Sequence, residues 1–268
     1  MQQTQHMNQI NYFRKKNLRI AGLIIILLIF TYGASMFSEY NHIDGVKTIP
    51  LAMSWMLENM FFSAATLEKL PKVLNVLWET IILSVISTTT ASVFAILFAL
   101  MGSKATQVNG ILALISRVIA SIFRNIPIVA WALVLVISFG QNAITGYLAL
   151  FFATFGFLVR AFIETIDESS KDTVEALAAT GATYFQTVSK AVIPESLPQM
   201  ISWILFMIET NIRSSTLIGI LTGSGIGYLF DMYYKRMDYE MVTLITLAIV
   251  ITVIVIELIS NALRREML

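Results

Sequence analysis

The 268-residue chain contains no cysteine, which excludes disulfides, thiolate metal ligands and thiol catalysis. Its two histidines, His6 and His42, lie outside the apolar segments, so we expect no metal site. Charged residues make up only 13% of the chain, against about 25% in soluble domains. The net charge is +1 and no basic patch is interleaved with aromatic residues, so nucleic acid is not an expected partner.

Long apolar runs take the place of the missing charge. Hydrophobic residues make up 57% of the chain, and the mean hydropathy is +0.76. From Asn125 to Val159 there is no charged side chain at all. Because about 20 apolar residues already cross a bilayer, this stretch must cross twice. The predicted fold class is therefore all-α: a polytopic transmembrane helical bundle of about six spans.

The predicted spans are separated by short charged or glycine-containing segments. We expect the third to bend near Arg124-Asn-Ile-Pro127, after an interfacial approach helix, because proline removes a backbone hydrogen bond. Phe139-Gly-Gln-Asn142 then forms an external turn. The six spans cover approximately residues 20–37, 78–101, 109–139, 144–163, 197–221 and 239–263.

Basic residues set the expected orientation. Arg14 to Arg19 precede the first span and Arg264-Arg265 end the last, which places both termini in the cytoplasm. A cleavable signal peptide is the alternative interpretation of the first span, because small residues follow its apolar part. We divide the chain into an N-terminal basic segment, first helix and external loop (1–75) and a core (76–268).

A polar insert, residues 167–195, interrupts the apolar sequence between spans four and five. It contains Glu175-Ala-Leu-Ala-Ala-Thr-Gly181, and Pro194 follows thirteen residues after the glycine. We predict a short helix over Ser170 to Thr180, stopped by Gly181, then a turn-rich helix over Thr183 to Ala191. Such a pair forms a rigid peg in water. The alternative is an ordinary loop that carries an amphipathic helix.

This spacing resembles the cytoplasmic coupling loop of bacterial ABC-importer permeases: Glu-Ala-Ala, three residues, Gly, nine residues, Ile-x-Leu-Pro. Leu177 replaces the second alanine, and Ala191-Val-Ile-Pro194 replaces the last element. The resemblance assigns ATPase coupling to Glu175, Ala176, Leu177, Gly181, Ile193 and Pro194.

A second pattern resembles span five of phosphonate importer permeases. It reads Glu209-Thr-Asn-Ile-Arg213-Ser-Ser-Thr-Leu-Ile-Gly219, then Gly223-Ser-Gly225-Ile-Gly227. Arg124-Asn-Ile-Pro127 is similar to the Arg-x-Ile-Pro element of that family, whereas Thr222 and Ser224 stand where it often has glycine. The chain thus resembles a phosphonate-type ABC transporter permease, a binding-protein-dependent importer inner-membrane component, from about Trp78 to Arg265.

The resemblance implies a type I ABC-importer permease for phosphonate or a related phosphorus oxyanion, phosphate or phosphite. It implies a multi-pass protein of the bacterial cell (inner) membrane that is not an enzyme. No cofactor is expected in this chain, since ATP and Mg would bind a separate ATPase. The implied partners are two copies of that cytoplasmic ATPase, an external substrate-binding protein, membrane lipid, and a second copy or a similar permease.

Two charged residues inside span five suggest a translocation path for the substrate. Glu209 lies about 11 residues beyond Pro198, hence ~16 Å into the bilayer, and Arg213 follows one turn later. Arginine suits phosphoryl-type oxygens because its planar fork makes two hydrogen bonds. We predict a path formed by Glu209, Asn211 and Arg213, in which Glu209 orients the guanidinium. A structural ion pair at a subunit interface is the alternative.

The glycines of this region match no nucleotide-binding loop, since neither a Walker ending nor a Gly-x-Gly-x-x-Gly spacing after a strand is present. We interpret them as a closely packed external connection. The candidate gate or hinge residues are Arg124, Pro127, Gly219, Gly223, Gly225 and Gly227.

Three other functions stay open. One is a methionine or other small-solute ABC permease. The others belong to different classes: an intramembrane enzyme that uses buried acids such as Glu209, and an ion-driven secondary carrier. No paired carboxylates, Ser/His/Asp set or metal-ligand cluster stands out in favour of catalysis.

Overall fold

The computed structural model describes residues 2–38 and 40–267, and every regular element within them is helical. The chain divides into two compact units, Met1–Asn59 and Met60–Leu268. The first unit holds α1 (Gln2–Phe37) and α2 (His42–Asn59). Within α1, Lys15–Phe37 is long and apolar enough to cross a membrane, which agrees with the predicted first span.

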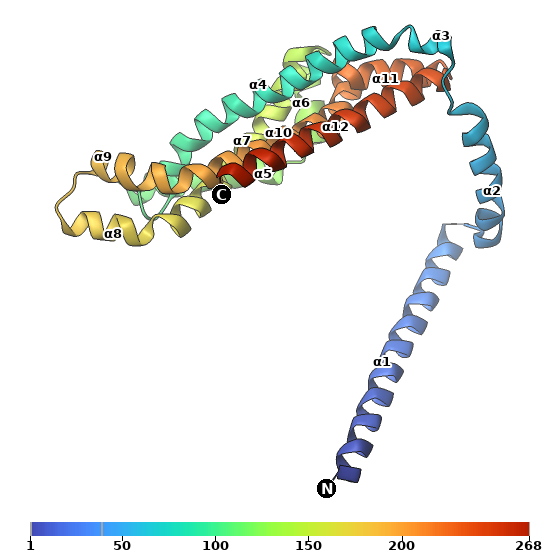
Figure 1. Ribbon diagram of the computed structural model, residues 1–268, viewed down its shortest axis with the longest axis horizontal. Coiled ribbons are helices and arrows are strands. Elements are labelled where there is room, and N and C mark those ends of the chain that lie inside the picture. Colours follow the sequence, from blue (N-terminus) through green and yellow to red (C-terminus); the bar gives the residue numbers. More distant parts are fainter. Residues whose placement is uncertain (1, 39, 268) are drawn as a thin grey trace. The chain divides into compact units, whose positions relative to one another are not determined.

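The second unit is a bundle in which α4, α7, α10 and α12 run side by side, with α8 and α9 projecting beyond the end where α4 and α7 finish (Figure 1). The predicted boundary at residues 75 and 76 falls inside α4. The elements of this unit are α3 (Ala64–Leu67), α4 (Leu70–Gly102), α5 (Gly110–Asn125), α6 (Ile128–Phe139), α7 (Ala143–Ser169), α8 (Lys171–Ala179), α9 (Tyr184–Thr187), the π-helical turn η1 (Val188–Val192), α10 (Ile193–Thr222), α11 (Gly225–Lys235) and α12 (Tyr239–Met267).

The described part of the chain holds five helices long and apolar enough to cross a membrane, or six if α5 and α6 count as one broken span. This confirms the predicted number. The axes of α5 and α6 differ by 89°, and Pro127 caps α6 at the break. The predicted bend is therefore present, and its cause is the missing donor and fixed φ of the proline.

Small residues allow α4 to pack closely on α7. Ala91, Ala95 and Ala99 recur every fourth residue along one face of α4 and are fully buried. They meet large buried side chains of α7, among them Leu158 and Phe162. Because lipid tails are as apolar as leucine, such close van der Waals contact, rather than escape from water, holds membrane helices together.

The segment after α10 is a helix, whereas the sequence predicts only a glycine-rich connection. Ile226, Leu229 and Tyr233 share one face of α11 and are buried against residues of α4 and α12 such as Leu77 and Ile245. This apolar spacing of three and four residues stabilises a helix despite the glycines that precede it.

Candidate functional site

The polar insert begins with α8, which ends as predicted at a glycine. Gly181 has φ +80°, and its N–H donates to the Ala178 carbonyl at 3.1 Å. The N–H of Ala182 donates to the Leu177 carbonyl at 3.2 Å. These two bonds form a Schellman motif, which closes a helix and reverses the chain. Gly181 supplies the left-handed backbone that the motif requires.

The second arm of the insert differs from the prediction. A capping box of Thr183 and Gln186 starts α9, and the chain then runs through η1 into α10 without a break. Ile193 and Pro194 therefore lie in the first turn of α10, not beyond the end of a separate helix. Pro194 directly follows the π-helical turn η1, where the regular hydrogen-bond pattern of the α-helix is interrupted, and Pro198 is accommodated inside α10.

A hydrogen bond braces the two arms. The Thr173 hydroxyl on α8 donates to the Glu195 carboxylate on α10 at 2.6 Å. Next to it, Val174 packs against the main core. A cavity of about 450 Å³ lies at the base of α8, lined by Lys104, Ala105, Asp167, Val174 and Glu175. The insert is thus held at its base and free at its tip.

The tip of the insert is exposed. Glu175, Ala176 and Gly181 are exposed and Leu177 is half-buried. Phe185 is 82% exposed, and its ring makes an edge contact with Tyr184 at 5.7 Å. The sequence prediction did not include these two rings, although an adjacent aromatic pair in a polar insert is a signal for a contact surface.

The loop after α4 is fixed next to the insert by Asp167 of α7. One carboxylate oxygen accepts hydrogen bonds from the Ser103 hydroxyl at 2.5 Å and from the backbone N–H of Lys104 at 2.7 Å. These partners are about sixty residues apart in the sequence, so no local motif reveals them. Asp167 therefore ties the end of α4 to the end of α7.

Inside the bundle, Glu209 is 7% exposed and contacts two arginines. Its Oε1 lies 3.1 Å from Arg213 Nη2, which is the predicted pair. Its Oε2 lies 3.6 Å from Arg264 Nη2, at the end of α12. The sequence prediction missed Arg264, because only folding brings α12 beside α10. The group carries a net charge of +1, and Arg213 is half exposed.

Asn211 faces another direction from Arg213. It is 2% exposed, and its Nδ2 donates to Thr88 Oγ1 at 2.8 Å and to Thr154 Oγ1 at 2.7 Å. The amide thereby joins α4, α7 and α10 in the interior of the bundle. The residues of the predicted path thus lie on two faces of α10, and the geometry of Asn211 favours a structural role.

The candidate gate glycines lie where α10 meets α11. Gly223 and Gly225 have φ of +65° and +63°, so they permit the turn between the two helices. At the crossing itself, a Cβ on Gly227 would overlap the Thr216 carbonyl oxygen, and one on Gly219 would overlap that of Ser224. The predicted close packing is therefore present.

The other two gate candidates flank the α5–α6 break. Arg124 is exposed near the end of α5, and Pro127 is the N-cap of α6. A Cβ on Gly156 of α7 would lie 2.5 Å from the backbone nitrogen of Arg124, so α7 packs directly against the end of α5 at the bend.

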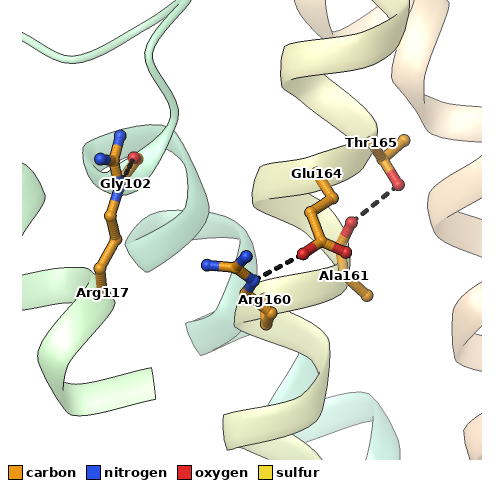
Figure 2. A network of polar contacts seen from close by, with 6 residues as sticks. All are labelled: Gly102, Arg117, Arg160, Ala161, Glu164 and Thr165. Atoms are coloured by element: carbon orange, nitrogen blue, oxygen red, sulfur yellow. Dashed lines mark hydrogen bonds and ion pairs between the residues drawn. The ribbon is translucent and has the colours of Figure 1, made fainter. Parts of the chain in front are cut away.

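A second ion pair, absent from the sequence prediction, lies on α7. Arg160 Nε donates to Glu164 Oε1 at 2.6 Å, and the two side chains are 49% and 53% exposed (Figure 2). In the same view Arg117 Nε donates to the Gly102 carbonyl at 2.7 Å and joins α5 to α4. Within residues 2–38 and 40–267, no group of three or more His, Asp or Glu side chains is arranged to hold a metal ion.

Known proteins resemble this chain over most of its length. A family described as "Binding-protein-dependent transport system inner membrane component" matches residues 91–266. The phosphite transport system permease protein PtxC of Stutzerimonas stutzeri is 30% identical over 70% of this chain and 68% of its own. The phosphate-import permease protein PhnE of Mycolicibacterium smegmatis is 26% identical over 71% of this chain and 36% of its own.

A solved structure shares the fold. Its title is "Inward facing conformations of the MetNI methionine ABC transporter", and the matched chain superposes with a TM-score of 0.66 at 24% identity. The match covers 77% of this chain and 100% of that one. At this identity the likeness shows the fold alone.

Proposed function

The chain belongs to the family of binding-protein-dependent transport system inner membrane components, and on that premise we propose that it forms the path of an ATP-driven importer for phosphonate, phosphite or phosphate. The names of PtxC and PhnE support this class of substrate. The chain itself is a multi-pass membrane protein and a transport subunit. In the proposed importer, ATP and Mg²⁺ bind a separate ATPase.

The observation that carries the proposal is the braced, exposed peg formed by α8, α9 and η1. Charged side chains such as Glu175 and Lys190 are exposed on the peg and are costly in lipid, so the peg faces water. Two copies of a cytoplasmic ATPase would grip the pegs of two permease subunits, either identical or similar. The exposed ring of Phe185 suits a partner pocket, because aromatic anchors carry much of the binding energy at protein interfaces.

The transport cycle then follows from the peg. ATP binding draws the two ATPase copies together, the pegs move with them, and the path opens outward to an external binding protein. Hydrolysis resets the path. In the proposed topology the peg and both termini face the cytoplasm, and the basic residues Arg264 and Arg265 at the end of α12 support this orientation.

Within the path, Arg213 attracts the oxyanion while Glu209 orients its guanidinium. A charge in a span is costly, so it faces a bundle interior or a water-filled path, and the half-exposed Arg213 fits the second case. A structural pair at the subunit interface is the alternative. If Arg213→Ala leaves membrane levels, ATPase assembly and full uptake intact, Arg213 has no role in the path.

The decisive experiment reconstitutes the permease with its ATPase and binding protein and measures ATP-driven uptake of phosphite, phosphate, methylphosphonate and methionine. We expect uptake of the phosphorus compounds. Uptake of methionine alone would refute the substrate class. Transport that survives loss of ATP but stops with the ion gradient would establish a secondary carrier, and turnover by the chain without an ATPase would establish an enzyme.

The peg is tested separately. Single cysteines at the exposed positions Ala176 and Ala179 should crosslink to the ATPase, and Phe185→Ala should weaken ATPase binding by at least about tenfold. Phe139→Ala, which removes an exposed ring at the opposite end of the bundle, is the matched control. Failure to crosslink, or equal effects of the two alanine substitutions, would contradict the proposed coupling.

A further inference from the structure

The Arg160–Glu164 pair lies on α7 at the peg-side end of the fourth span, and both side chains are about half exposed. Arg160 is nine residues from the end of α7, hence about 14 Å along the helix axis. Its Nε bonds Glu164, and no other partner of its guanidinium is found within the described residues. Four of its five N–H donors are therefore available. Near the end of a span, a half-exposed charge faces water or the headgroup region rather than lipid tails.

Phe157, about one turn before Arg160 on α7, belongs to a cluster of three aromatic rings. Phe157 of α7 contacts Trp203 and Phe206 of α10, with ring centroids 5.7 and 6.1 Å apart. Trp203 and Phe206 also meet each other at 6.1 Å. All three rings are partly buried and pack against the main core. The aromatic cluster thus joins α7 to α10 at one level of the bundle.

Helix periodicity places charges on both sides of the aromatic cluster. Glu164 lies seven residues beyond Phe157, two turns along the same face of α7. Arg213 lies seven residues beyond Phe206, two turns along the same face of α10. The two helices run in opposite directions, because α7 ends and α10 begins at the peg. Arg160 and Glu164 therefore lie on the peg side of the cluster, and Arg213 lies about 10 Å beyond it on the α11 side.

We propose that Arg160 is a second binding station for the phosphorus oxyanion, separated from the Arg213 station by an aromatic barrier of Phe157, Trp203 and Phe206. This inference rests on the proposed import function and extends it to the inner half of the path. Glu164 holds the guanidinium through Nε, so that both terminal nitrogens face the substrate. A planar fork of this kind binds two oxygens of one anion at once.

The two proposed stations share one arrangement of charges. Each arginine pairs with a carboxylate on its own helix, four residues away: Arg160 with Glu164 and Arg213 with Glu209. The acid partly neutralises the arginine and keeps binding weak enough for release, as conduction requires. Apart from the indole N–H of Trp203, the rings between the stations offer no hydrogen bond to an anion, and because they pack together the substrate crosses only when they separate.

The test uses the complete transporter, with its ATPase and binding protein, and compares phosphite uptake with ATP hydrolysis. Arg160→Gln should lower the maximal uptake rate about tenfold, as for the loss of a charge-assisted hydrogen bond, while hydrolysis stimulated by the binding protein continues. The maximal uptake rate of Arg160→Lys should lie between those of the unmodified transporter and Arg160→Gln, because lysine retains the charge without the planar fork of the guanidinium. Arg236→Gln, an exposed arginine beyond α11, is the matched control. Unchanged uptake per ATP in Arg160→Gln would overturn the proposal.

A second measurement separates a substrate site from an arginine that reaches lipid headgroups. The chain has no cysteine, so Glu168→Cys, one turn beyond Glu164 on α7, gives a single exposed label and keeps both Arg160 and Glu164. A charged thiol reagent should reach it in inside-out vesicles, and phosphite should slow its reaction. Val93→Cys on the exposed face of α4 should stay unlabelled. Labelling of Glu168→Cys that phosphite does not slow would overturn the proposal.

The two hypotheses fail in different ways. If the unmodified transporter shows no ATP-driven uptake of phosphite, phosphate or methylphosphonate, the proposed function is wrong. If the unmodified transporter is active and Arg160→Gln matches the control, only the second station is wrong.

Discussion

Replacing Asn211 by alanine should destabilise the bundle rather than block a path. The substitution removes two hydrogen bonds to Thr88 and Thr154. At about 0.6 kcal/mol each in a membrane protein, these contribute about 1.2 kcal/mol. The lost amide leaves a cavity of roughly 25 Å³, which adds about 0.6 kcal/mol. The sum of about 2 kcal/mol corresponds to a fall in melting temperature of roughly 4–8 °C.

The assay is thermal unfolding of the purified permease in detergent, with ATP-driven uptake measured on the same variants. Asn125→Ala is the control, because its amide bonds only within its own helix, to Ser121, and its loss should cost less than about 0.5 kcal/mol. Thr154→Val should cost less in the Asn211→Ala background than alone. An unchanged melting temperature together with abolished uptake would refute this reasoning and return Asn211 to the path.

Two other substitutions test the packing around the site. Gly227→Ala should lower the free energy of unfolding by about 1–3 kcal/mol, because its methyl group would overlap the Thr216 carbonyl. Gly22→Ala, with open space around it, is the control. Equal thermal stability of the two variants would contradict the close crossing of α10 and α11. Asp167→Ala should speed hydrogen exchange at Lys104, because the backbone N–H loses its carboxylate acceptor. The exposed neighbour Glu168→Ala should leave that exchange rate unchanged, and equal rates in both variants would show that Asp167 does not fix the loop.

Local patterns predicted the features whose causes are local. Apolar length alone indicates the spans, since a bilayer sets how many residues must cross it. Pro127 marks the α5–α6 break because its ring limits its own backbone and that of its predecessor. Gly181 marks the end of α8 because only a residue that tolerates positive φ closes a helix in this way.

Features that depend on distant contacts could not be predicted in the same way. Arg264 meets Glu209, and Asp167 meets Ser103, only after the helices pack. The glycines before α11 led us to predict only a connection, although Ile226 and the later buried residues of α11 follow a helical spacing. Continuity of α9 with α10 was missed because two prolines suggest a break, whereas Pro194 follows the π-helical turn η1 and Pro198 is accommodated within α10.

The unbroken course of α9, η1 and α10 has a mechanical consequence. Tyr184–Thr222 is one 39-residue rod, about 58 Å long. If its fulcrum is the buried Asn211 junction, the arm toward Tyr184 measures about 40 Å and the arm toward Thr222 about 16 Å. A sideways push at the long end therefore swings the short end the opposite way by less than half the distance. Because the end at Thr222 moves less than the end at Tyr184, the force at the Thr222 end is larger by the same ratio.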